Sequence, residues 1–171
     1  MWQIIVNFAE NKVSSAMKKK ILILLLFALA IPGTNLRAQC IALGERAPEI
    51  KPTAWLGDKV PAEAPTTYVE FFSASNPAGI ASLKHLQTLT SKFGTKLRVI
   101  VVSRDKEETL APIVAPYLSP RFAVALDPQG RLFSAYGVSY IPFGVLLDAR
   151  GRALWQGNTR QLTEEIIRNS R

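Results

Sequence analysis

Few residues of this chain could do chemistry, and they do not form a familiar catalytic set. The 171 residues include one cysteine, Cys40, and one histidine, His85. The other candidates gather at one junction, where the apolar run TTYVEFF passes through SASN into PAGIASLKHL. Ser73 and Ser75 lie in that junction, and Glu70 lies in the apolar run before it. The junction therefore looks like a site, but it holds no obvious reactive group.

The sequence supplies none of the partners that these residues would need. A serine nucleophile requires a base and an oxyanion hole, and no G-x-S-x-G elbow surrounds Ser73 or Ser75. His85 has no cysteine or carboxylate at metal-ligand spacing, so we predict no metal site and no cofactor. The glycines after the junction are isolated turn glycines and do not form a phosphate-binding loop.

Glu70 is the one ionisable group placed among large apolar side chains. Its neighbours are Val69, Phe71 and Phe72. Burial disfavours the charged carboxylate, so we expect a raised pKa for Glu70. The plainer alternative is that Glu70 hydrogen-bonds a neighbour or reaches solvent at the end of a strand.

The flanking pattern predicts which elements position the junction. The β-branched and aromatic run at 66–73 predicts a buried strand. Asn76 followed by Pro77 is typical of a helix start, with an N-cap residue and a proline at the first helical position. Apolar residues continue at helical spacing to Phe93, and Gly94 is expected to end the helix.

The rest of the chain continues to alternate between strand and helix patterns. We predict strands at 97–103, 122–126, 144–148 and 153–157, and a short edge strand within TAWL, residues 53–56. A helical segment is expected at 107–117, a turn with a short helix at 127–137, and a further helical segment at 162–169. Pro112 and Pro116 should shorten or break the first of these helices, and Asn158 or Thr159 should cap the last. The order β α β α β α β β α predicts parallel crossovers followed by a hairpin, and so an α/β fold with a mixed sheet.

The N-terminal region has the pattern of an export signal. Lys18–Lys20 precede eleven apolar residues, 21–31, and a polar stretch that ends at Ala38. This order is typical of a secretory signal, and eleven apolar residues are too few for a membrane span, which needs about 20. We predict an extension at 1–16 that precedes the true start or is disordered, a signal peptide at 17–38, and one exported, periplasmic domain at 39–171. An uncut membrane anchor is the alternative.

Charge and cysteine content limit the partners. The formal net charge of +8 falls to +4 when residues 1–38, with five basic and one acidic residue, are removed. The remaining basic residues are scattered singly, so nucleic-acid binding is not expected. A lone Cys40 cannot form an internal disulfide, and Gln39 before it is not the small residue that lipidation favours, so a lipid anchor is not expected. Cys40 is left as a free thiol or a bridge between chains.

Three stretches resemble a known family. YVEFFSASNPAGIASLKHL, LRVIVVSRDKEE and AYGVSYIPFGVLLDARGRALWQG together resemble the thioredoxin-like fold, and more closely the exported thiol-disulfide oxidoreductases of the TlpA and ResA type. The resemblance covers residues 44–169. It implies a central mixed β-sheet flanked by helices, a C-terminal β-hairpin and helix, and a cis-proline at Pro142. Glu70 matches the family's semi-buried acid.

The chain departs from the family at the active-site turn. The family's W-C-x-x-C places Ser75 at the tryptophan, Asn76 at the first cysteine and Gly79 at the second. Thiol-disulfide exchange needs an attacking thiolate and a resolving thiol, and neither Asn76 nor Gly79 can supply one. Cys40 lies too far upstream to replace either thiol. No catalytic residue is therefore supported, and we do not expect redox catalysis.

Three functional hypotheses remain. The favoured one is a redox-inactive module that binds a peptide or protein partner by strand-like pairing along Ile141. Its groove would lie between the turn and the proline and include Phe72, Ser75, Asn76, Pro77, Ile141 and Pro142. Free N–H groups at residues 76–79 could also donate hydrogen bonds to a small anion. The alternatives are an enzyme of the thiol-disulfide oxidoreductase family that acts in envelope redox homeostasis without the CxxC pair, or a structural domain without a ligand.

Overall fold

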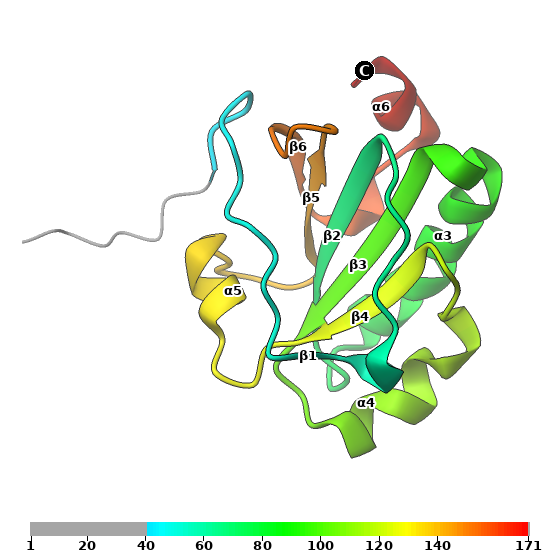
Figure 1. Ribbon diagram of the computed structural model, residues 1–171, viewed down its shortest axis with the longest axis vertical. Helices are drawn as coiled ribbons and strands as arrows, with labels where there is room; N and C mark the ends of the chain where they lie inside the picture. Colours follow the sequence, from blue (N-terminus) through cyan, green and yellow to red (C-terminus); the bar gives the residue numbers. More distant parts are fainter. Residues whose placement is uncertain (1–40, 171) are drawn as a thin grey trace, which may run out of the picture. The chain divides into compact units, whose positions relative to one another are not determined.

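The structure, a computed structural model, describes residues 41–170 (Figure 1). The predicted extension, the predicted signal peptide and Cys40 lie outside the described residues, so these three expectations stay predictions. The boundaries of the domain predicted at 39–171 also remain a prediction.

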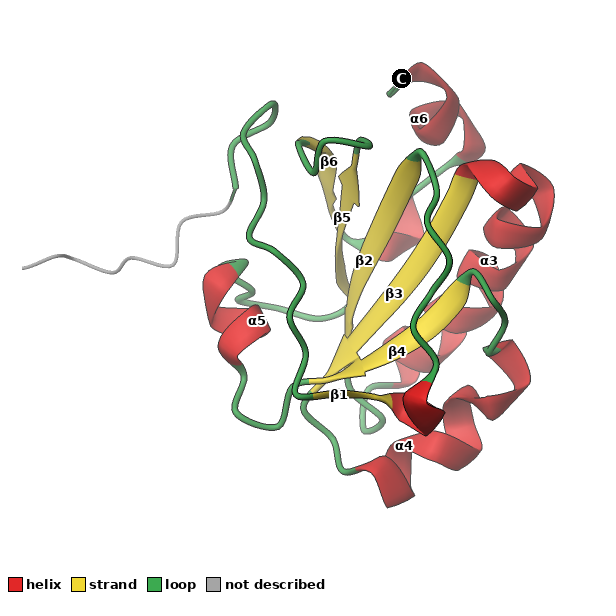
Figure 2. Ribbon diagram, in the orientation of Figure 1, coloured by secondary structure: helices red, strands yellow, loops and turns green. Residues whose placement is uncertain are grey.

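A six-stranded mixed sheet forms the centre of the described part (Figure 2). Its strands, in spatial order, are β1 (Ala54–Trp55), β4 (Phe122–Leu126), β3 (Leu97–Ser103), β2 (Thr66–Phe72), β5 (Phe143–Leu147) and β6 (Ala153–Gly157). The pairs β2–β3 and β3–β4 are parallel, whereas β1–β4, β2–β5 and β5–β6 are antiparallel. The predicted parallel crossovers and C-terminal hairpin are therefore confirmed.

Helices cover the sheet on both faces. The helices are α3 (Pro77–Phe93), α4 (Glu107–Val114), α5 (Arg131–Ala135) and α6 (Glu164–Asn169). Three helices, α3, α4 and α6, pack on one face of the sheet. Their buried apolar side chains contact Tyr68 and Phe72 of β2 and every second residue of β3. Leu132 and Phe133 of α5 pack on the other face against Phe71. Strand residues alternate between the two cores, as the two-residue period of a strand requires.

The second face has two different covers along the strands. α5 packs over the end of β2 that carries Phe71, where the rings of Phe71 and Phe133 lie 5.0 Å apart. Residues 41–50 pass over the rest of this face and contribute Ile41 and Ile50 to the core. This N-terminal segment is continuous with the sheet edge, because Gly44 N donates to Ala153 O over 2.7 Å and Arg46 pairs with Arg152.

Two predicted helices differ from the structure in detail. The segment at 107–117 is an α-helix to Val114, with Pro112 inside it, and then a short 3₁₀ turn, so the expected break is confirmed. The last helix begins at Glu164 and not at Leu162, and its N-cap is Thr163. Asn158 instead caps a 3₁₀ turn at Thr159–Gln161. The sequence offers three capping residues in close succession, and only the packing of this segment selects among them.

Among residues 41–170, no helix is both long enough and apolar enough to cross a membrane.

Candidate functional site

The predicted active-site turn lies between the end of β2 and the start of α3, and Asn76 organises it. Asn76 has extended backbone angles, and its Oδ1 accepts from Ala78 N over 2.9 Å and from Gly79 N over 3.2 Å. Pro77 follows at the first helical position, where a missing N–H has no cost. The predicted helix start is therefore confirmed, and Asn76 acts as its cap.

The same side chain also joins the turn to the proline loop. Asn76 Nδ2 donates to Ile141 O over 3.1 Å, across 65 positions of sequence. The peptide bond that follows, Ile141–Pro142, is cis. A cysteine at position 76 would have neither the amide donor nor the capping oxygen, so the asparagine does two structural tasks that a thiol cannot do.

The expectation of free N–H groups at residues 76–79 is wrong. Ala78 N and Gly79 N donate to Asn76 Oδ1, Ile80 N donates to Asn76 O over 3.0 Å, and Asn76 N donates to Ser73 O over 3.0 Å. Pro77 has no N–H. The first turn of α3 therefore has its donors occupied by the chain itself and does not present an anion site.

The six residues predicted to form the groove fall into two groups. Phe72 is 1% exposed and Pro142 is buried, so both support the groove from below and cannot contact a partner directly. Ser75 and Pro77 are exposed, and Asn76 and Ile141 are half-buried.

Two side chains that the prediction did not include add apolar surface nearby. Tyr140 is 49% exposed and Ile80 is 37% exposed. The Tyr140 ring lies edge-on to Phe143, with their centroids 5.3 Å apart.

Packing restricts position 79, where the resemblance predicts the second cysteine of the family. A side chain at Gly79 would place its Cβ 3.3 Å from Phe72 Cδ2, which is tighter than most real contacts. Gly79 itself is buried. Phe72 would therefore have to shift by a few tenths of an ångström before any side chain could stand at position 79.

A carboxylate that sequence reasoning missed stabilises the turn from the neighbouring strand. Asp105 Oδ2 accepts from Ala74 N over 2.7 Å and from Ser103 Oγ over 2.8 Å, and Ser73 Oγ lies 3.5 Å from Asp105 Oδ1. The parallel pairing of β2 with β3 puts Phe72 beside Ser103, so the residues that follow both strands meet at the same edge. The available signal was that two neighbouring parallel strands end in Ser73 and in Ser103 to Asp105.

Glu70 lies directly beneath the turn and is fully buried. Its carboxyl oxygens contact Ser82 Oγ at 2.8 Å and the hydroxyl of Thr159, and Tyr68 Oη donates to Thr159 Oγ1 over 2.9 Å. Burial raises the pKa of Glu70 to about 8, although the bonds from Thr159, Ser82 and Tyr68 oppose this shift. Of the two forms of the plainer alternative, hydrogen bonding to a neighbour is confirmed, and exposure to solvent is wrong because Glu70 is 0% exposed.

Counting hydrogens around Glu70 supports the neutral acid. Ser82 Oγ contacts both Glu70 Oε1 and Gly79 O, at 2.8 and 2.6 Å, but carries only one hydrogen. If Glu70 is protonated on Oε1, it donates to Ser82, and Ser82 donates to Gly79 O. The donors then form one chain from Tyr68 through Thr159, Glu70 and Ser82 to Gly79 O, with every hydrogen used once.

His85 is an exposed helix residue with a structural contact. Its Nε2 lies 2.8 Å from Leu162 O, and a carbonyl oxygen can only accept, so this nitrogen carries the proton. Within residues 41–170, no group of three or more histidine, cysteine, aspartate or glutamate side chains is arranged to hold a metal ion.

Comparison with known proteins identifies the fold and leaves the activity open. No family model and no curated protein matches the sequence. The structure is similar to that of a protein described as a thiol:disulfide interchange protein DsbE from Chlorobium tepidum, with a TM-score of 0.64 and 22% identity over 76% of this chain and 98% of that one.

Two further structures agree with this. The thioredoxin domain of a thiol-disulfide oxidoreductase from Bacteroides vulgatus has a TM-score of 0.60 and 17% identity over 76% of this chain and 95% of its own. A thioredoxin-like protein from Aeropyrum pernix has a TM-score of 0.54 and 18% identity over 64% of this chain and 77% of its own. The chain has the thioredoxin-like fold, as the sequence predicts. At these identities, the similarity shows the fold alone.

Proposed function

We propose that this protein is an exported, periplasmic thioredoxin-like module that does not exchange disulfides, and that it binds a protein or peptide partner at the surface around Asn76 and Ile141. The observation that carries the proposal is the double use of Asn76. Its Oδ1 caps α3 and its Nδ2 donates to Ile141 O, at the position where the resembling enzymes have their attacking cysteine.

Chemistry supports the absence of exchange. The chain has one cysteine, and Cys40 lies outside the turn in sequence, whereas exchange needs an attacking and a resolving thiol. Glu70 is kept beneath the turn, but the hydrogen-bond chain from Tyr68 to Gly79 O gives it a structural use that requires no thiol.

The surface beside the turn supports binding. Tyr140 and Ile80 are two large apolar side chains that remain exposed in this region. Among the described residues, Ile141 N has no hydrogen-bond acceptor, while Ile141 O is occupied by Asn76. A partner backbone would therefore accept from Ile141 N and cover Tyr140, which is a one-sided form of strand pairing.

Site-specific photo-crosslinking from position 140 tests the binding surface. We expect a crosslinker that replaces Tyr140 in the full chain to capture one defined partner band in the cell envelope. The same group at Leu43, which is 63% exposed but distant from the turn in sequence, is the matched control. Equal capture from both positions, or capture only from Leu43, would contradict the proposal.

A disulfide-reduction assay with insulin tests the absence of exchange. We expect the wild type to match the Cys40→Ala variant at background turnover. Turnover above that variant would instead support an enzyme that acts by a route without the CxxC pair. The double variant Asn76→Cys, Gly79→Cys asks whether the turn keeps the shape needed for exchange. Phe72 must move by a few tenths of an ångström to admit the second thiol, so gain of activity is expected to be larger with Phe72→Leu added.

A further inference from the structure

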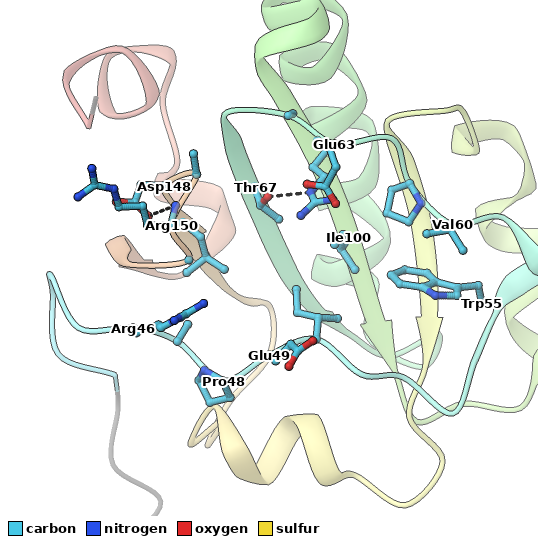
Figure 3. A pocket seen from close by; sticks show the side chains of 18 residues that line it. Arg46, Pro48, Glu49, Trp55, Val60, Glu63, Thr67, Ile100, Asp148 and Arg150 are labelled. Atoms are coloured by element: carbon cyan, nitrogen blue, oxygen red, sulfur yellow. Dashed lines mark hydrogen bonds and ion pairs between the residues drawn. The ribbon is translucent and has the colours of Figure 1, made fainter.

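A cavity of about 760 Å³ lies on the face of the sheet that residues 46–50 cross, and it extends to the end of β2 where the strand begins (Figure 3). Thr67, Ile100 and Leu147 line it from the sheet, at the end of β2 where the strand begins. Residues 46–50 line one side, and Val60, Pro61, Glu63 and Ala64 line another. Its volume falls within the range of about 300–1,000 Å³ that is usual for small-molecule sites.

The cavity offers apolar contact surface. Pro48, Trp55 and Val60 line it together with Ile100, and Figure 3 shows these side chains around one opening. Val60 is 69% exposed, the largest exposed fraction among the exposed large apolar side chains of the described part. An apolar group of a ligand could contact these side chains without any rearrangement of the core.

Three arginines gather beside this opening. A smaller hollow of about 560 Å³ is lined by Gly44, Arg46, Arg150 and Arg152, and it shares Arg46 and Arg150 with the larger cavity. In Figure 3 the Arg46 side chain points toward the larger cavity, whereas that of Arg150 points away from it. Arg46 therefore lies between the two hollows.

The acids around the opening already have partners. Glu49 pairs with Lys51 at 2.9 Å, and Glu63 pairs with Arg98 at 2.7 Å. Asp148 uses its Oδ1 to accept two backbone N–H groups of its own turn, each over 2.8 Å. Within residues 41–170, none of the three arginines beside the opening has an ion pair, and Asp148 is the one lining acid that also has none, so a local excess of positive charge remains.

The backbone that carries these arginines is held by hydrogen bonds. Arg46 and Arg152 face each other in an antiparallel bridge, and Ala47 N donates to Gly151 O over 2.8 Å. Gly151 has a φ of 74°, which a side chain would strain, and it allows the tight turn that Asp148 closes. These hydrogen bonds fix the backbone positions from which the arginine side chains extend.

We infer that these two hollows form one binding site for a small amphipathic anion, with a carboxylate or phosphate head on Arg46, Arg150 and Arg152 and an apolar body beside Trp55 and Ile100. Guanidinium groups bind both head groups through paired N–H donors. This site is separate from the surface around Asn76, and no part of the proposed function depends on it.

Calorimetric titration of the full chain with decyl phosphate and with decanoate, both kept below micelle-forming concentrations, tests the site. We expect both to bind, and inorganic phosphate and acetate to bind at least about tenfold more weakly because they lack the apolar body. Backbone amide shifts in NMR spectra should change at Thr67, Ile100 and Gly151 and stay unchanged at Asn76. Shifts at Asn76 without shifts at Ile100 would overturn the inference.

Two charge-reversal variants separate a specific site from general attraction. Arg46→Glu with Arg150→Glu should weaken decyl phosphate binding by about tenfold or more, given the strength of hydrogen bonds to charged groups. Arg131→Glu with Arg160→Glu changes the net charge equally at exposed positions outside both hollows, and it should leave binding unchanged. Equal weakening by the two pairs would overturn the inference.

A steric variant and a vesicle arm complete the test. Ala64→Phe adds bulk to the wall of the larger cavity and should weaken decyl phosphate while leaving inorganic phosphate unchanged. Phosphatidylglycerol vesicles distinguish a free amphiphile from a membrane surface. Binding to vesicles without binding to monomeric decyl phosphate would show a surface attraction and overturn the cavity site.

Discussion

The two ends of β2 differ in how the chain treats its polar groups. At the end that carries Phe72, Asn76 satisfies the N–H groups of α3 and the carbonyl of Ile141, and Asp105 satisfies Ala74 N. At the other end, roughly 20 Å away along a seven-residue strand, Arg46, Arg150 and Arg152 have no ion pairs within residues 41–170.

The difference separates groups that stabilise the fold from groups that do not. Polar side chains at the turn form internal hydrogen bonds, so the turn is part of the fold. At the other end of β2, Arg46, Arg150 and Arg152 form no ion pairs within residues 41–170. Their charges therefore contribute little to the stability of the fold and are available to a ligand. Variants at the two ends should therefore affect different measurements.

The largest expected effect is at Glu70, through pH. Its folded-state pKa of about 8 lies above the 4.5 of an unperturbed glutamate, so between these values the folded state holds a proton that the unfolded state has lost. The stability contributed by Glu70 is full below about pH 4.5, falls as pH rises, and is gone above about pH 8. The Glu70→Gln variant should lack this fall, and the two stability curves should separate by an amount on the order of a few kcal/mol.

Urea unfolding at intervals from pH 4.5 to 9 measures this. Glu108→Gln, at an exposed position on α4, controls for the loss of one acid. Near pH 5 the Glu70→Gln variant should be less stable than wild type by about 1 kcal/mol, because one hydrogen-bond pattern is replaced by another. Parallel pH curves for wild type and Glu70→Gln would show that Glu70 does not hold its proton in the folded state.

The next largest effect is expected at Asn76. Asn76→Ala removes a helix cap, worth about 1 kcal/mol, and the bond to Ile141 O, worth about another 1 kcal/mol. Asn76→Ser keeps a capping oxygen but has no amide to donate to Ile141 O, so it should cost about half as much. Equal losses in the two variants would show that the link to Ile141, and not the cap, carries the contribution.

The smallest effect on stability is expected at the arginine end. Arg46→Gln with Arg150→Gln should change the free energy of unfolding by at most about 0.5 kcal/mol, upward at low salt because like charges are removed. Arg98 lies at the same end, but it has an ion pair with Glu63 and donates to Thr67 Oγ1 over 2.8 Å. Arg98→Gln should therefore lower the free energy of unfolding by about 1 kcal/mol. A large loss in the double variant would mean that these arginines stabilise the fold after all.

The sequence predicts the strands and the main helix closely, because those signals are local. The run at 66–73 and the strand at 97–103 match β2 and β3 within one residue, and Asn76–Pro77 marks the start of α3. The last helix is less well placed, since three capping residues compete. The anion site at the turn is wrong because a side chain that caps a helix occupies the same N–H groups that an anion would need.

By itself, the sequence determines the order of the elements, the presence of a single cysteine and the presence of an acid in an apolar strand. These follow from residue type and period, which act over a few positions. Only the tertiary structure decides that Asn76 reaches Ile141, that Glu70 shares hydrogens with Thr159 and Ser82, and that Arg46 meets Arg150 and Arg152 beside a cavity. Asn76 and Ile141 are 65 positions apart, Glu70 and Thr159 are 89 apart, and Arg46 and Arg152 are 106 apart. No local sequence pattern indicates where such a distant partner will lie.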